Sequence, residues 1–278
     1  MLGIIGGSGL GEALFAEAFG TETKDHAVGT PYGRPSSPIR VVSWGGIDVA
    51  ILARHGDGHV FPPSMVPYRA NVFALKKLGV THLLTTGAVT SLRAVIERAP
   101  APALALVDQL IDRTYRRVPT FFDEGMAVHA DLTQPYCAAL RQRLMGLSAS
   151  APVASLDAKA TYVCIEGPET ATAAEADLHR AWGADVMGMT ALPEARLARE
   201  AEMCCALIVL PGDLKIATAC TVALLKAAVA DIAKTPLGAC ACQSSLARAI
   251  TTRRDRILPA TIEKYGPLVA KYFGEKTS

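Results

Sequence analysis

The sequence predicts an α/β fold: a single domain with a central mixed β-sheet flanked by helices. Short apolar runs bounded by turn signals alternate with segments of helical periodicity, which is the pattern of strands and helices that share one sheet. The chain has 278 residues, 50% of them hydrophobic, and no internal repeat or linker divides it. One large core is therefore expected, and we predict one domain over residues 1–278.

Strands are predicted where short apolar runs lie between turn signals. They are Gly3–Ile5, Arg40–Trp44, Asp48–Leu52, His82–Thr86, Ala103–Leu110, Ala160–Ile165, Ala184–Met187 and Cys205–Leu210.

Helices are predicted where apolar residues recur about every three to four positions. They cover the segment after the opening glycines, Ser64–Val80, 134–147, 169–182 and 192–203. From Thr218 onward the chain is alanine-rich and helical, with a break near 235–245. We expect the C-terminal helices, from about residue 216, to pack on the same domain.

Composition excludes several classes of partner. The formal net charge is +2 without a basic stripe, so no nucleic-acid partner is expected. The longest uninterrupted apolar run, near Met203–Leu210, is too short to span a bilayer, and the N-terminus lacks the features of a signal peptide. We therefore expect a cytoplasmic protein without a membrane partner.

The seven cysteines favour reduced thiols over a disulfide framework, since their number is odd. Cys204 and Cys205 lie inside an apolar run and are expected in the core. Cys240 and Cys242 have one residue between them, whereas a zinc ribbon needs two to four and a second ligand pair. We expect no structural metal.

The opening stretch GIIGGSGLGE brings a glycine cluster to the end of a predicted strand. The glycines do not fit the spacing of a dinucleotide fingerprint, and no Lys-Ser/Thr follows for a phosphate-binding Walker loop. What remains is a tight turn in which Ser8 offers a hydroxyl and backbone amides are available for a small oxyanion. The alternative is a turn that needs only the positive φ of glycine.

Two further strand ends carry groups that bind anions. Arg54 and His55 follow an apolar strand, and a guanidinium can hold two oxygens of an anion. The strand His82–Thr86 ends in small residues with amides and hydroxyls. Because strand ends of an α/β sheet meet at one edge, we expect one shared anion site there.

At this point the motifs resemble a known family, the methylthioadenosine phosphorylases and purine nucleoside phosphorylases. The resemblance runs in order from about Gly3 to Asp213. It implies a single α/β domain, commonly assembled as a trimer, that cleaves the glycosidic bond of a purine nucleoside with inorganic phosphate. It also implies that neither a metal nor an organic cofactor is needed. The segments that carry it are GIIGGSGL, TPYGRPSSPI, ARHGDGH, PYRANVFALKKLGVTHLLTTGAV, DQLIDRT, IEGPETATAAE and GADVMGMTALPEARLARE.

The resemblance also assigns roles to residues of this chain. Met189 corresponds to the methionine along the ribose, and Asp213 to the acid that serves N7 of the departing purine. His129 corresponds to a residue near the 5′ end of the nucleoside that can reach a neighbouring subunit. The phosphate-binding residues implied are Ser8, Arg54, His55, Thr86, Gly87, Ala88 and Thr190.

Departures from the family pattern lie mainly at the base pocket. Relatives that take 6-aminopurines carry a second aspartate where this chain has Lys215, which cannot accept a hydrogen bond from the amine. Glu169 and Thr170 stand where relatives have a polar residue and then an aromatic that stacks on the base, while Thr172 is retained in type. Thr90 replaces a customary glycine, and the segment after Asp213 is shortened.

Several functions remain open at this stage. Methylthioadenosine phosphorolysis is the first choice, and a 6-oxopurine nucleoside such as inosine, guanosine or methylthioinosine is the alternative, with Lys215 donating to O6. A degenerate relative that binds a purine without turnover is the third. A nicotinamide-dependent oxidoreductase built on the glycine turn fails on the glycine spacing.

Overall fold

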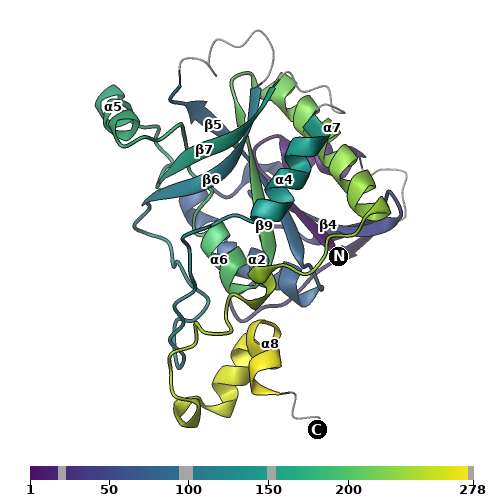
Figure 1. Cartoon of the computed structure of the whole chain (residues 1–278), viewed down its shortest axis with the longest axis vertical. Helices are drawn as coiled ribbons and strands as arrows, with labels where there is room; N and C mark the ends of the chain where they lie inside the picture. Colours follow the sequence, from purple (N-terminus) through teal and green to yellow (C-terminus); the bar gives the residue numbers. More distant parts are fainter. Residues whose placement is uncertain (18–22, 94–102, 149–154, 275–278) are drawn as a thin grey trace.

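A nine-stranded mixed sheet forms the centre of the protein in this computed structural model (Figure 1), which describes residues 1–17, 23–93, 103–148 and 155–274. The strand order is β2-β3-β4-β1-β5-β8-β7-β6-β9, and β9 also pairs with β5, so part of the sheet closes on itself. The strands are β1 (Leu2–Gly6), β2 (Thr23–His26), β3 (Ile39–Trp44), β4 (Ile47–Ala53), β5 (His82–Ser91), β6 (Ala103–Arg113), β7 (Ser155–Ile165), β8 (Val186–Gly188) and β9 (Cys204–Pro211).

Parallel pairing of β4, β1, β5 and β9 decides where the site lies. Gly6 at the end of β1 is level with Ala53 of β4, and Ile5 is level with Thr85 of β5. The residues that follow Gly6 and Ala53 therefore leave the sheet together, beside the middle of β5. This confirms the prediction of an α/β fold with a mixed sheet. The third predicted strand end differs, because β5 does not stop at Thr86 but stays paired with β9 and then β8 as far as Ser91.

Helices cover both faces of the sheet (Figure 1). One buried cluster includes apolar side chains of α2, α6 and α8, and a second includes those of α1, α4 and α7. The C-terminal helix α8 thus joins the first core, as expected. The helices are α1 (Leu10–Glu17), α2 (Tyr68–Lys77), α4 (Ala138–Leu147), α5 (Ala173–Ala181), α6 (Glu194–Glu200), α7 (Leu214–Lys234) and α8 (Pro259–Phe273).

The differences from the predicted elements have local causes. β2 was not predicted because its residues, TKDH, are polar and largely exposed at the sheet edge. α2 begins at Tyr68 rather than Ser64, since a 3₁₀ turn and Pro67 precede it. α7 begins four residues before the predicted Thr218, because Asp213 caps its first turn.

The helix α7 is long and apolar enough to cross a membrane by length and composition alone. In the structure, Ala217, Leu224, Leu225 and Val229 on this helix are buried in the same cluster as side chains of α1, α4 and β9. An apolar helix in such a position is typical of the core of a soluble protein.

Candidate functional site

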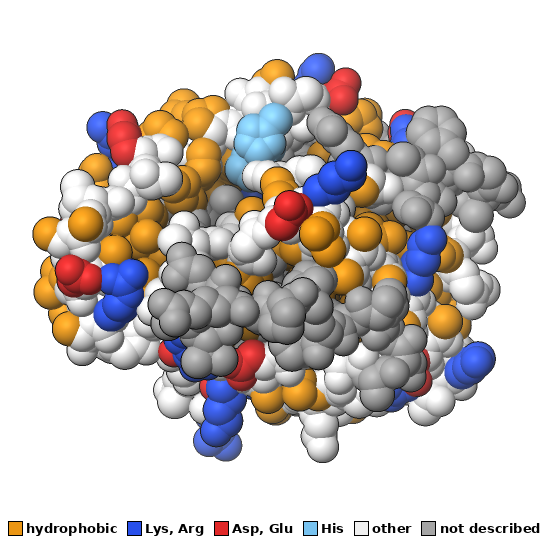
Figure 2. Space-filling view, turned by 90° about the horizontal axis from the view of Figure 1, so that it is seen from above, with side chains coloured by type: hydrophobic (Ala, Val, Ile, Leu, Met, Phe, Trp, Pro, Cys, Tyr) orange, Lys and Arg blue, Asp and Glu red, His pale blue; other side chains and the backbone are white. Residues whose placement is uncertain are grey.

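A cavity of ≈ 440 Å³ opens where the strands finish. Figure 2 views this end of the molecule from above, and histidine surface lies beside a hollow there. The cavity combines the glycine turn after β1, the end of β4, the end of β5 and the segment after β8. Its wall includes Gly7, Ser8, Arg54, His55, His59, Pro63, Gly87, Ala88, Val89, Thr90, Pro168, Met187, Gly188, Met189 and Thr190.

The glycine turn packs tightly against the middle of β5. The Gly7 amide donates to Thr86 Oγ1 at 3.2 Å, and that hydroxyl donates to the Ile5 carbonyl at 3.3 Å. A Cβ at Gly7 would lie 2.8 Å from both Arg54 Nη1 and the Thr86 carbonyl oxygen, so only glycine fits without a shift. Thr86 is fully buried and is not among the residues that line the cavity. Its hydroxyl braces the glycine turn, and its role in binding phosphate stays a prediction.

Arg54 is buried and bound by a carboxylate. Its Nε and Nη2 donate to Glu194 Oε1 and Oε2 at 2.9 and 2.7 Å, and Nη1 donates to the Thr86 carbonyl at 2.7 Å. Burial lowers the pKa of Arg54, but the charge and hydrogen bonds of Glu194 outweigh it and hold that pKa above its usual value. The sequence had suggested that the guanidinium holds two oxygens of an anion. In the structure, the edge formed by Nε and Nη2 faces Glu194 instead. Of the five guanidinium N–H groups, one on Nη1 and one on Nη2 remain for the cavity.

His55 is held as a neutral ring. Its Nδ1 lies 2.7 Å from the Phe61 carbonyl, which can only accept, so Nδ1 carries the proton. Burial and then the charge of Arg54 lower the pKa of His55 to about 4. At neutral pH its Nε2 is thus a hydrogen-bond acceptor, and a partner there must bring its own proton.

His59 stacks on His55, with ring centroids 4.1 Å apart, and also lines the cavity. Its φ of 57° is in the left-handed region, an uncommon conformation for a residue other than glycine. Sequence analysis did not select His59. The available signal was its position four residues after His55, within a stretch whose turns bring both rings to the same wall.

A second buried ion pair holds the wall after β8. Arg117 Nε donates to Glu166 Oε1 at 3.1 Å, and Arg117 Nη1 donates to the carbonyls of Met189 and Leu192 at 2.5 and 2.6 Å. The Thr190 amide donates to the Tyr162 hydroxyl at 3.2 Å. Met189 and Thr190 are thereby fixed opposite the glycine turn. Arg117, Glu166 and Glu194 were not found from the sequence, because their partners are distant along the chain.

Five predicted nucleoside-binding residues lie outside the cavity wall as the structure describes it. Asp213 is exposed, and its Oδ1 accepts from the amides of Lys215 and Ile216 at 2.9 and 3.1 Å, so it caps α7. The others are Lys215, Thr170, Thr172 and His129, all exposed or partly exposed.

Two of these residues cap helices. Asp213 caps α7, and Thr172 forms a capping box with Glu175 at the start of α5. Their roles in nucleoside binding stay predictions. The first turn of α7 nevertheless borders the glycine turn, because a Cβ at Gly9 would lie 3.8 Å from Leu214 Cδ2. The amino end of α7 therefore adds a positive dipole beside the cavity.

Residues 1–241 match the model of the family described as the phosphorylase superfamily. The S-methyl-5′-thioadenosine phosphorylase of Koribacter versatilis is 39% identical over 296 residues, covering 99% of this chain and 97% of that protein. That of Thermofilum pendens is 45% identical over 203 residues, covering 73% and 74%. A crystal structure of a methylthioadenosine phosphorylase sourced from an Antarctic soil metagenomic library superposes with a TM-score of 0.88 at 35% identity, covering 96% and 98%.

Removing Glu194 should strongly destabilise the fold, because Arg54 would be left buried without its counter-ion. We expect Glu194→Ala to lower the free energy of unfolding by about 3–5 kcal/mol, measured by urea denaturation. Asp25→Ala is the matched control, since Asp25 binds Arg40 in the same two-bond geometry at the surface. That control should change stability by less than about 1 kcal/mol. Equal losses in the two variants would contradict the role given to burial.

Proposed function

The chain belongs to the phosphorylase superfamily, and from this premise we propose that it cleaves 5′-methylthioadenosine with inorganic phosphate. The products are the free purine base and 5-methylthioribose 1-phosphate. The observation that carries the proposal is the cavity at the strand ends, where a glycine turn, a buried arginine, a neutral histidine and Thr190 surround one space. The methylthioadenosine phosphorylases named above support the choice of substrate.

Phosphate is proposed to bind between the glycine turn and the end of β5. Backbone amides and the Ser8 hydroxyl, the two remaining N–H groups of Arg54 and the Thr190 hydroxyl are the donors available there. Inorganic phosphate keeps at least one P–O–H at neutral pH, and His55 Nε2 can accept from it. His55 thus favours a phosphate that is bound through its protonated oxygen.

In the proposed reaction, the C1′–N9 bond breaks and a bond forms from C1′ to a phosphate oxygen. Positive charge develops on the ribose and negative charge on the purine, so a phosphate held beneath C1′ stabilises the transition state before it attacks. Met189 and Thr190 form the wall on the ribose side. The purine leaves with the electron pair of the broken bond and takes a proton at N7.

Asp213 is the proposed proton donor or hydrogen-bond partner of N7. Both of its capping hydrogen bonds go to Oδ1, so Oδ2 can turn to a base bound above the first turn of α7. Lys215, exposed in that same turn, favours the second candidate, a 6-oxopurine nucleoside, because an ammonium group can donate to O6.

We propose that the chain works as a homotrimer or a multiple of it. His129 is exposed and lies outside its own cavity wall, a position from which it can serve a neighbouring copy. Met65, Tyr115 and Val118 are 67%, 77% and 47% exposed, and a neighbouring copy could cover these apolar side chains. Sedimentation equilibrium should give three times the 29.2 kDa of one chain. A single species of 29.2 kDa at micromolar concentration would refute the assembly.

Phosphorolysis is tested by offering methylthioadenosine, adenosine, inosine and methylthioinosine, each with and without phosphate. We expect adenine to be released from methylthioadenosine only when phosphate is present. The free base is measured by chromatography. Hypoxanthine alone would identify the 6-oxopurine candidate. If none of the four nucleosides yields a base, the proposal fails.

Ser8→Ala should raise the KM for phosphate by about tenfold or more, whereas Ser91→Ala, outside the cavity wall, should leave it unchanged.

The two roles of Asp213 can be separated by two substitutions. Asparagine is a good helix cap but a poor proton donor, so Asp213→Asn should keep the melting temperature and lower kcat by about 100-fold or more. Asp213→Ala should lower both, with a loss of about 1 kcal/mol in stability. If Asp213→Asn keeps full kcat, the carboxylate is a cap alone.

A further inference from the structure

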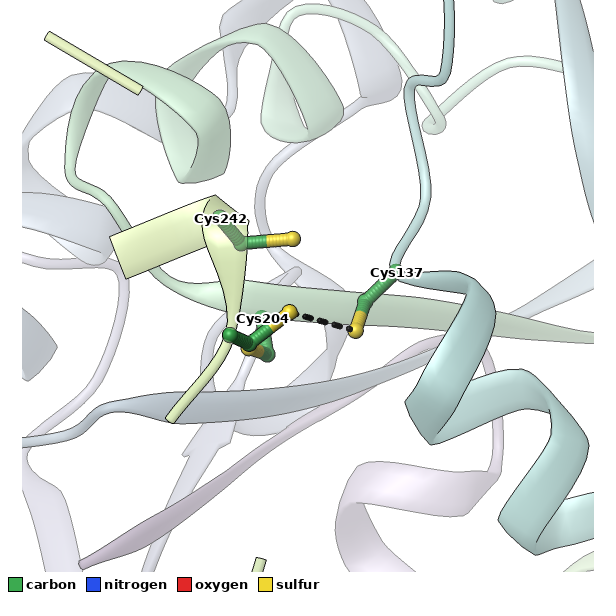
Figure 3. A group of neighbouring side chains, drawn as sticks. Cys137, Cys204 and Cys242 are labelled. Atoms are coloured by element: carbon green, nitrogen blue, oxygen red, sulfur yellow. Dashed lines mark hydrogen bonds between the residues drawn. The ribbon is translucent and has the colours of Figure 1, made fainter. Parts of the chain in front are cut away.

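Four cysteine sulfurs lie together at the end of the sheet opposite the cavity. Cys137 precedes α4, Cys204 begins β9, and Cys240 and Cys242 come from the segment after α7. Their Sγ atoms all lie within 4.8 Å of one another, and Cys137 Sγ is 3.6 Å from Cys240 Sγ. Figure 3 shows Cys137, Cys204 and Cys242 meeting from different segments of the chain.

The spacing of the sulfurs fits a tetrahedral metal ion. A zinc–sulfur distance of about 2.3 Å places the four sulfurs of a tetrahedron about 3.8 Å apart. Four thiolates around one point are typical of zinc or of an iron–sulfur centre, because soft ligands select such metals. A complete set of four protein ligands leaves no open position, as in structural zinc sites.

Cys204 points away from the core that contains its neighbour. Successive residues of a strand face opposite sides of the sheet, and Cys205 belongs to the cluster of α2, α6 and α8, whereas Cys204 belongs to that of α1, α4 and α7. Cys137 and Cys242 lie in the cluster of Cys204, and Cys240 packs against it. The alternation of side chains along β9 therefore places Cys204 on the same side as the other three cysteines and Cys205 on the opposite side of the sheet.

Backbone amides already donate to two of the sulfurs. The Leu140 amide donates to Cys137 Sγ at 3.5 Å, at the amino end of α4, and Cys240 Sγ accepts from the Gln243 amide in a capping box. These hydrogen bonds help to hold the sulfurs of Cys137 and Cys240 where they lie.

Hydrogen bonds away from the sulfurs hold the two contributing segments in place. The Cys137 amide donates to the Cys205 carbonyl at 2.8 Å. The Ser245 hydroxyl donates to the Arg199 carbonyl at 2.6 Å, and the Leu246 amide donates to Glu202 Oε1 at 3.0 Å. The cysteines are thus positioned by the surrounding fold, so a metal would meet a largely preformed set of ligands.

We propose that Cys137, Cys204, Cys240 and Cys242 bind one zinc ion in a structural site. The ion would tie the segment after α7 and the start of α4 to the first residue of β9. The expectation of no structural metal rested on the spacing of Cys240 and Cys242 and on the lack of a second ligand pair nearby in the sequence. It could not include two ligands from distant segments.

The site should stabilise the protein without taking part in its reaction. Cys204 is level with His82 at the start of β5, whereas the cavity is lined from Gly87 onward. Five residues of strand separate the two levels, a distance of about 16 Å at the usual rise per residue. Zinc binding is therefore independent of the proposed phosphorolysis.

The test is the metal content of the full-length protein, expressed with added zinc and purified without chelator under reducing conditions. We expect about one zinc per chain by mass spectrometry of the metal, released when a mercurial reagent titrates the thiols. Substitution by cobalt(II) should produce the charge-transfer and visible bands of a tetrahedral thiolate site. The double variant Cys240→Ser, Cys242→Ser should lose at least tenfold of the zinc, while Cys220→Ala, a cysteine of α7 outside the group, should keep it.

Stability and activity give a second readout. Chelation should lower the melting temperature of the wild type and leave that of the double variant unchanged. At temperatures below the melting transition, the rate of phosphorolysis should be the same with and without chelator. A wild type with no zinc and no cobalt spectrum would overturn the proposal. So would disulfides among the four cysteines in freshly purified protein, detected by peptide mapping. If the double variant does not fold, the wild-type metal content and cobalt spectrum still decide.

Discussion

The buried ion pair between Arg54 and Glu194 is the interaction on which the site depends. Arg54 follows β4, Glu194 begins α6, and Arg54 Nη1 also holds the Thr86 carbonyl in the middle of β5. One side chain thereby joins the end of one strand to a second strand and to a helix. Burying two charges carries a desolvation penalty of several kcal/mol, which only a fully hydrogen-bonded pair can offset. The close approach of Gly7 to the same guanidinium follows from this arrangement, since any larger residue would displace it.

The pair also sets the electrostatics of the cavity. Glu194 neutralises the charge of Arg54, and His55 is uncharged at neutral pH. An anion would therefore be bound mainly by directed hydrogen bonds and the dipole of α7, with little net positive charge. Such a site suits an anion that must enter and leave in every cycle, because strong net attraction would hold the ground state as tightly as the transition state.

Sequence analysis succeeded where local pattern and parallel pairing decide the outcome. Apolar runs located most strands, and the glycine turn, Arg54 and His55 came together because parallel strands end at one edge. The capping roles of Asp213 and Thr172 were not predicted, since the same residue types cap helices and bind ligands, and the sequence did not locate the start of either helix. Glu194 could not be found because its partner is 140 residues away along the chain.

The cysteine group also could not be found from the sequence, because its members lie far apart along the chain and are brought together by the sheet. A pair of cysteines with one residue between them indicates little by itself, but β9 and α4 bring two more sulfurs to it from far along the chain. β5 and β9 run from this group to the cavity, so their parallel pairing connects the cysteine end of the sheet to the cavity end. A metal ion at the first end, as proposed, would limit local unfolding of the strands there. The second end is already held by its own buried ion pairs, Arg54–Glu194 and Arg117–Glu166. The two ends of the sheet would therefore be stabilised by separate sets of side chains.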